Sequence, residues 1–331
     1  MLPGRPRGSA KRAAGSWGGS GWAHERRAGW PGRIRVRLED LRRGELVRDV
    51  RGPPRRRDAG EPDGRPLGRE PARKEGRRRV SAPDPLARHI LSLADTKRLL
   101  GIRYSDWILG SPSIETGIAA SSMAQDEWGH ARLLYSMLKR LGFDPFEVEH
   151  ERPADRYYSA PALDDPFEDW ADFVAATVVV DGALAVALES FGGGNFALAR
   201  SRVPKMLAEE EYHRQFGAAW FTRLAGSGGE GAARVRAAAL AMLPSTLAWL
   251  LPDDDLNGTL VEEGAIWAGA RVREACEARI GATLAAAGVA LADIEPARAG
   301  WDPERRRGPG APAEEAVERA RGDRNRALFV E

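Results

Sequence analysis

The chain has 331 residues, with 50 Lys and Arg against 48 Asp and Glu, so its formal net charge is only +2. A single cysteine, Cys276, excludes an internal disulfide and fits a reducing compartment such as the cytoplasm. The sequence has no run of about 20 apolar residues, and its basic N-terminus lacks the apolar core of a secretory signal. We therefore expect neither a membrane span nor secretion.

Basic residues are concentrated in residues 1–83, which are rich in Arg, Gly and Pro and show no helical or strand periodicity. Such a composition cannot bury enough apolar surface to offset the chain entropy lost on folding. A basic segment could attract nucleic acid, but Trp17, Trp22 and Trp30 lie among glycines without a repeat, which argues against a base-stacking module. We expect a disordered leader and no nucleic-acid partner.

From residue 84 onward the apolar residues recur at spacings of three and four, which predicts long helices and an all-α class. Asp84 and Pro85 are suited to begin the first helix, and Ser111 or Ser113 to cap the second. We expect helices at residues 86–109, 113–141, 167–191, 197–224, 231–251 and 256–287. Residues 84–290 then form the helical domain, and residues 291–331 a mostly irregular tail with one weak helix at 313–321.

Two of these helices carry a carboxylate and an imidazole three residues apart, Glu127 with His130 and Glu210 with His213. Three residues rotate a helix by about 300° and advance it by about 4.5 Å, so both side chains of a pair leave the same face. Two helices that each direct Glu and His to a shared centre are the pattern of a di-iron or di-manganese bundle.

A dinuclear site needs two further carboxylates from two other helices. The third helix offers Asp181, which lies in a long apolar run where an ionised carboxylate is costly unless a cation or partner neutralises it. A bond to Arg or to the backbone is the alternative for this residue. The first helix offers Asp106, which is equally suited to be an ordinary acid at a helix end.

The Glu-x-x-His spacing alone is a weak pattern, because it occurs a third time at Glu147 and His150. That pair lies between two prolines, outside any long amphipathic helix, and we exclude it. Glu262 and Glu263 follow an acid-rich helix start, where negative charge favours the helix dipole, and we exclude these residues as ligands as well.

Acidic residues directly precede both ligand glutamates. Asp126 stands before Glu127 and Glu209 before Glu210. Because metal-bound imidazoles usually donate their other N–H to a carboxylate, Asp126 and Glu209 could orient the histidines; the alternative is that they are solvated helix acids. Four carboxylates and two imidazoles suit iron, or less well manganese, better than zinc, and iron in such a site supports O₂ reduction coupled to substrate oxidation.

The segments AQDEWGHARLLY, VVDGALA and EEEYHRQFG resemble the bacterial phenylacetyl-CoA epoxidase subunits, the phenylacetic acid catabolic proteins of the ferritin-like superfamily, over about residues 84–290. The resemblance implies a ferritin-like four-helix bundle with extra C-terminal helices. It also implies the iron ligands Asp106, Glu127, His130, Asp181, Glu210 and His213. The chain departs from the family at Asp106, where the family has Glu, and it is shorter between Asp106 and Pro112. These departures leave the acyl-CoA substrate open.

The family contains a catalytic subunit and a scaffold subunit that has lost the metal motif, and the two Glu-x-x-His pairs make this chain resemble the catalytic type. The resemblance implies two iron ions, a reductase that supplies electrons from NAD(P)H, a homologous scaffold partner, and epoxidation of the aromatic ring of a CoA thioester. A scaffold role and a ferritin-type iron-binding role remain as alternatives. Trp128, Phe216 and Trp220 could line a substrate pocket, although aromatic residues at helical spacing more often belong to a core.

Overall fold

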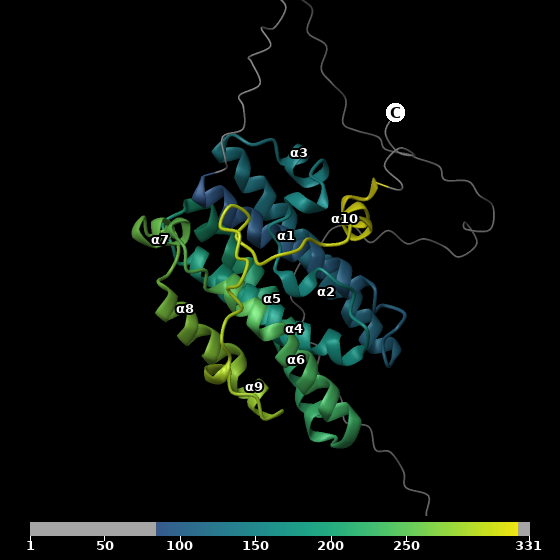
Figure 1. Cartoon of the computed structure of the whole chain (residues 1–331). Coiled ribbons are helices and arrows are strands. Elements are labelled where there is room, and N and C mark those ends of the chain that lie inside the picture. The colour runs from purple at the N-terminus through teal and green to yellow at the C-terminus, as the bar shows by residue number, and fades with distance from the viewer. Residues whose placement is uncertain (1–83, 324–331) are drawn as a thin grey trace, which may run out of the picture. The chain divides into compact units, whose positions relative to one another are not determined.

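The computed structural model describes residues 84–323 (Figure 1). The expected disordered leader therefore lies outside the described residues. Within the described part the chain is all-α, with one isolated bridge between Asp302 and Arg307 in place of any strand. This confirms the fold class expected from the sequence.

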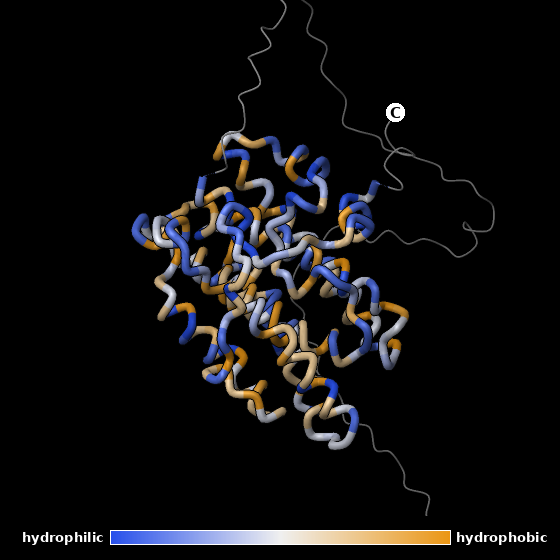
Figure 2. Tube along the Cα trace, in the orientation of Figure 1, coloured by the Kyte–Doolittle hydropathy of each residue, from blue (hydrophilic) through white to orange (hydrophobic). Residues whose placement is uncertain are grey.

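Four long helices form the centre of the fold: α1 (Pro85–Ser105), α2 (Ile114–Met137), α4 (Trp170–Gly192) and α5 (Ala197–Gly226). Helix α1 packs along α2, and α4 packs along α5, with α6 (Gly229–Leu250) on the side of α4. Hydrophobic and hydrophilic segments alternate along most helices (Figure 2), as they do in helices with one buried face. The packing is that of a helical bundle.

Helix α4 is the central apolar helix. It is long and apolar enough to span a membrane by composition, but 94% of the relevant window is buried inside the protein, as in the core helix of a soluble protein. Helix α6 with α7 (Asp255–Glu262) passes the same test only as a pair bent by 59°. The buried Asp181 lies in the middle of α4 and is therefore surrounded by protein.

The helix ends follow the capping signals in the sequence. Asp84 caps α1 by accepting a hydrogen bond from the backbone N–H of Ala87 at 2.8 Å, and Pro85 occupies the first helical position. Ser113 caps α2 in a reciprocal capping box with Thr116. Helix α1 ends at Ser105, four residues before the predicted end, which makes Asp106 its C-cap.

The predicted continuous helix at 256–287 is wrong. The segment divides into α7, a turn, α8 (Gly269–Cys276), a π-helical turn at Glu277–Gly281 and α9 (Ala282–Ala285). The turn after α7 places Gly264 at a φ of 69°, a left-handed conformation that glycine adopts without steric cost. Glu262 and Glu263 lie at the C-terminal end of α7 and take no part in the cluster described below.

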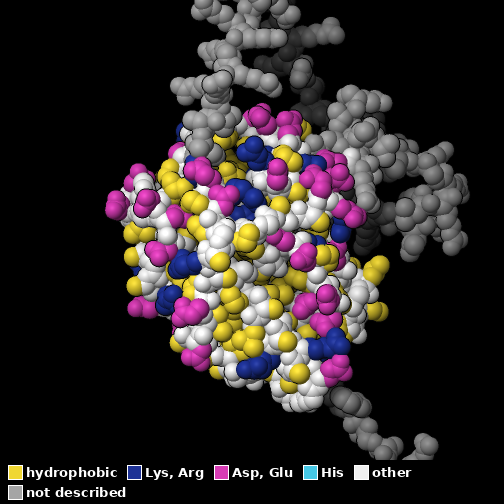
Figure 3. All heavy atoms as spheres, viewed as in Figure 1, with side chains coloured by type: hydrophobic (Ala, Val, Ile, Leu, Met, Phe, Trp, Pro, Cys, Tyr) yellow, Lys and Arg dark blue, Asp and Glu magenta, His cyan; other side chains and the backbone are white. Residues whose placement is uncertain are grey.

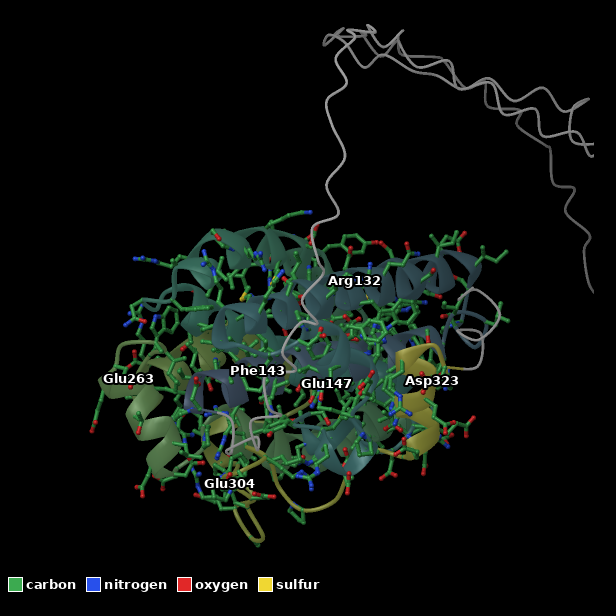
Figure 4. All side chains as sticks on the ribbon, turned by 90° about the horizontal axis from the view of Figure 1, so that it is seen from above. Arg132, Phe143, Glu147, Glu263, Glu304 and Asp323 are labelled. Atoms are coloured by element: carbon green, nitrogen blue, oxygen red, sulfur yellow. The ribbon has the colours of Figure 1, made fainter. Side chains whose placement is uncertain are left out.

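The segment between α2 and α4 contains α3 (Pro145–His150), which carries the third Glu-x-x-His pair. Glu147 is exposed there, and Figure 4 labels it. The segment after residue 290 packs onto the bundle: α10 (Glu314–Arg321) contacts α1, and the buried Arg307 bonds Ser159 and Asp164. The predicted C-terminal tail is thus irregular over much of its described length but attached to the helical core.

Asp95 of α1 joins the loops to the bundle and is fully buried. It accepts hydrogen bonds from the hydroxyl of Tyr135, from both terminal nitrogens of Arg152 and from the backbone N–H of Tyr158. Because removing one partner of a buried ion pair leaves the other charge without compensation, we expect Asp95→Ala to lower the free energy of unfolding by about 3–5 kcal/mol. Urea denaturation would measure the loss.

The exposed Asp155 in the loop that follows Arg152 provides the control. Asp155→Ala should stay within about 0.5 kcal/mol of the wild type, as surface substitutions usually do. An equally small effect of Asp95→Ala would contradict the structural role assigned to this network.

Candidate metal centre

Four side chains from three helices converge inside the bundle. They are Glu127 of α2, Asp181 of α4, and Glu210 and His213 of α5. One donor atom from each lies within 4.8 Å of the others, and all four residues are buried. The sequence predicted these residues as ligands, and the structure brings them together as that prediction requires. Metal binding itself stays a prediction.

The two imidazoles are oriented in the same way. His213 directs Nδ1 into the cluster, 3.0 Å from Asp181 Oδ2, and His130 directs Nδ1 to within 3.1 Å of Glu210 Oε1. On the outer side, His130 Nε2 lies 2.7 Å from Glu209, and His213 Nε2 lies 3.5 Å from Asp126. Each outer acid therefore contacts the histidine of the opposite helix, which is the arrangement expected of acids that orient metal-ligating imidazoles. On the face shown in Figure 3 no described histidine reaches the surface.

This pairing leads to a prediction for Asp126→Asn and Glu209→Gln. Each substitution keeps the shape of the side chain but removes the carboxylate that fixes an imidazole, so we expect metal affinity to fall by about 10–100-fold. Glu209→Gln should have the larger effect because its contact is shorter. Competition with a chelator would measure the affinity. Glu211→Gln, which removes an exposed acid on the same helix, should leave it unchanged.

Asp106 does not belong to the cluster. It caps the end of α1, where it is paired with Arg319 and lies 3.8 Å from Arg103. The expectation that six predicted ligands converge is therefore corrected at this position: the alternative of an ordinary helix-end acid describes Asp106.

Helix α1 instead contributes Lys97 to the cluster. Its fully buried ammonium lies 2.7 Å from Glu127 Oε1, 3.3 Å from Asp181 Oδ1, and in hydrogen-bond contact with Glu210 Oε1. Tyr104, about two turns later on the same face of α1, donates its hydroxyl to Asp181 Oδ2 at 2.9 Å. The sequence analysis missed both residues. The sequence contains a signal for both residues. Lys97 and Tyr104 lie on the apolar face of α1 that begins at Ile90, and a lysine on such a face is costly unless it is paired.

Protonated Lys97 and His213 offset most of the charge of the three carboxylates when the cluster holds no metal. Burial alone would lower the pKa of Lys97, but Glu127, Glu210 and Asp181 raise it above its usual value. Burial also opposes protonation of His213, yet its bonds to Asp126 and Asp181 raise its pKa to about 12. Burial raises the pKa of Glu127 to about 7, with Lys97 opposing this shift. For Asp181, burial favours the neutral acid, but Lys97 and His213 hold the pKa well below its ordinary range.

The chemistry of the donor atoms fits a metal ion. Two buried carboxylate oxygens, Glu127 Oε2 and Glu210 Oε2, have no hydrogen-bond partner among the described residues. Unpaired buried acceptors are costly, and a bound cation would satisfy them. On the Asp181 side, Asp181, Glu127, Glu210 and His213 supply four ligands for one metal ion. On the α1 side, the Lys97 ammonium occupies the place where a two-metal site needs a fourth carboxylate.

The cluster is closed to large molecules. The cavity that touches both Asp181 and Glu210 has a volume of about 10 Å³, room for a single water, and the π-helical turn covers it with Arg279 and Ile280. Phe216 and Trp220 pack edge-on against Trp170 in an aromatic group, as core residues do.

Trp128 packs over Gly101, where a Cβ atom would lie 2.4 Å from its indole nitrogen, and lines a separate surface cavity of about 470 Å³. The structure thus places none of the three predicted pocket aromatics in the cavity beside the cluster.

The comparison with known proteins agrees with the geometry. No curated protein matches the chain. The model of one protein family, described as phenylacetic acid catabolic protein, matches residues 73–307. This match covers more than half of the sequence and includes all the residues of the cluster, so the chain belongs to the phenylacetic acid catabolic protein family.

Proposed function

We propose that the chain is an iron-binding subunit of a multisubunit oxygenase that oxidises an aromatic acyl-CoA in the cytoplasm, working with a homologous scaffold subunit and an NAD(P)H-dependent reductase. The family supports the class of complex. The observation that carries the metal-binding role is the matched orientation of the imidazoles, each with Nδ1 toward the carboxylates and Nε2 toward an acid of the opposite helix.

In this function, different residues of the chain would bind the ion, exclude water and position a ligand. Glu127, Asp181, Glu210 and His213 would hold the ion, with His130 beside Glu210. Iron so held supplies O₂ reduction coupled to oxidation of the substrate. The apolar surroundings of α4 exclude water, and Tyr104 fixes Asp181 by its hydrogen bond.

A scaffold role is the second candidate, and Lys97 favours it. An ammonium bonded to three carboxylates, together with protonated His213, offsets most of the negative charge of the cluster without metal, so the bundle can fold and pack against a catalytic partner with no iron at all. Two irons, as the resemblance implies, require Lys97 to leave the carboxylates. One ion on the Asp181 side requires a smaller movement.

Iron analysis of the purified chain, together with its Mössbauer spectrum, separates the two roles. The proposed function predicts stoichiometric iron and NAD(P)H-dependent oxidation of phenylacetyl-CoA only when reductase is added. The scaffold role predicts less than a tenth of an ion per chain after growth in iron-rich medium, and that result would replace the first proposal by the second. Rapid iron oxidation without reductase, in a closed cage assembly, would contradict both and favour the ferritin-type alternative.

A further inference from the structure

A third cavity lies apart from the metal centre, between the N-terminal part of α1, the C-terminal part of α4, and α7 and α8. Its volume is about 320 Å³, within the range of small-molecule sites. His89 lines it from α1, and Lys97 follows about two helical turns later on the same helix. Arg306 lines it from the loop at residues 301–307, in which Figure 4 labels Glu304.

The Arg306 guanidinium has no anionic partner among the described residues. Its side chain is 4% exposed, and its terminal nitrogens lie 3.4 and 3.5 Å from one neutral acceptor, Asn257 Oδ1, which is long for a hydrogen bond. Its Nε has no partner. Asp254, which acts on Arg306 electrostatically, already accepts bonds from Asn257 N and from Trp301 Nε1. Burial lowers the pKa of Arg306 to about 10, with Asp254 opposing this shift.

The backbone holds Arg306 in this position at a cost. Its φ is 49°, in the left-handed region that arginine seldom adopts. Strained residues of this kind concentrate at sites where the side chain has a task. A buried cation without a counter-charge, held by a strained backbone, indicates an anion that the protein itself does not supply.

The remaining lining has both polar and apolar parts. His89 is 5% exposed, and neither of its ring nitrogens has a hydrogen-bond partner within the described part of the chain. Arg273 and Arg298 are exposed at the rim, where Asp253 is the one lining acid. Leu251, Ile266 and Trp267 contribute apolar surface, and Trp267 is fixed by a backbone bond to Ser190 Oγ at 2.8 Å.

We propose that this cavity binds a small organic acid, with its carboxylate on Arg306, a hydrogen bond from His89 and its apolar body against Leu251, Ile266 and Trp267. A guanidinium presents parallel N–H groups that match a carboxylate, and a neutral imidazole can donate one further bond. The apolar wall favours an aryl or alkyl carboxylate over inorganic phosphate, which shares the oxyanion chemistry but has no apolar body. The site is independent of the metal-binding role proposed above.

Isothermal titration calorimetry of the full chain in EDTA tests this site with four probes: phenylacetate, its uncharged amide, acetate and inorganic phosphate. We expect phenylacetate to bind and the other three to bind at least tenfold more weakly, a difference of about 1.4 kcal/mol. Arg306→Gln should weaken phenylacetate binding at least tenfold, Arg306→Lys should retain part of it, and His89→Gln should weaken it several-fold.

Arg271→Gln is the matched control, because Arg271 stacks on the outer face of Trp267, 3.7 Å from the ring centroid, but does not line the cavity. Phenylacetate binding to Arg306→Gln with wild-type affinity, or no binding to the wild type at millimolar concentration, would overturn the proposal. Tighter binding of phosphate than of phenylacetate would overturn the organic part of it. If Arg306→Gln does not fold, the comparison of acid with amide on the wild type, together with His89→Gln, decides.

Discussion

Lys97→Glu is expected to convert the cluster into a complete two-metal site. Glutamate at this position presents a carboxylate from α1 in place of the ammonium, which gives four carboxylates and two imidazoles from four helices. We expect the variant to take up two Fe²⁺ or Mn²⁺ ions per chain, and the wild type no more than one, because its own ammonium occupies the α1 side. Elemental analysis after loading and desalting measures the ratio.

The same substitution should make the protein dependent on metal for folding. The metal-free variant would bury four carboxylates without Lys97, and breaking a buried ion pair typically costs about 3–5 kcal/mol. We expect urea denaturation in EDTA to show a loss of at least this size, and added Mn²⁺ to restore the stability by mass action. In the wild type the rescue by Mn²⁺ should be smaller.

Lys97→Met separates the two effects, because it removes the cation without adding a ligand. It should share the instability in EDTA but bind fewer ions than Lys97→Glu. Lys139→Met changes an exposed lysine and should alter neither quantity. Two ions per wild-type chain, together with unchanged stability of Lys97→Met in EDTA, would show that the ammonium does not hold the cluster together. This test measures the metal content and the folding stability, so its outcome does not depend on whether the protein oxidises an acyl-CoA.

The predicted site residues that the structure brings together are mostly those whose relative directions are fixed by one helix. Glu127 with His130, and Glu210 with His213, share a face because of helical spacing alone, and the structure brings both pairs together. Asp181 was recognisable because an acid within an apolar run must be compensated. The all-α class and the caps at Asp84 and Ser113 followed from local patterns in the same way.

The site contacts that could not be predicted from the sequence depend on how each helix is oriented about its own axis relative to its neighbours. Asp106 and Lys97 lie nine residues apart on α1, a rotation of about 180°, so they point to opposite sides of the helix. The choice of Asp106, the acid that the first helix offered, therefore selected the face of α1 that points away from the cluster. The residue on the face toward the cluster is the base Lys97. The crossed contacts of Asp126 with His213 and of Glu209 with His130 also depend on the distance between α2 and α5, which no local pattern records.

The folding stability of the metal-free protein should depend strongly on pH. In the metal-free protein the folded-state pKa of Glu127 is about 7, above its ordinary value of 4.5, so the folded chain binds this proton more tightly than the unfolded chain. Stability from this group therefore falls as the pH rises from 4.5 to 7. His213 acts in the same direction: its contribution is complete below pH 6.5 and is lost as the pH rises toward 12. Asp181, with a lowered pKa, loses its contribution only in acid, below pH 3.8.

We therefore expect the chain in EDTA to be most stable in mildly acidic solution and to lose about 1.4 kcal/mol per pH unit for each proton that the folded state retains. Urea denaturation at about pH 5, 7 and 9 measures the slope. Glu127→Gln, which cannot titrate, should flatten the part below pH 7, and Glu211→Gln, at an exposed acid outside the cluster, should not.

Metal should reverse this dependence. Carboxylates and imidazoles bind metal only after losing their protons, so the affinity of the cluster rises with pH, and the stability gained from saturating Co²⁺ or Mn²⁺ grows over the range in which the metal-free protein weakens. The two curves should therefore diverge as the pH rises. Parallel curves would mean that the ion binds elsewhere. Metal binding changes this pH dependence only if the ion competes with protons for Glu127 and His213. Divergence that disappears in His213→Gln would place the ion in the cluster.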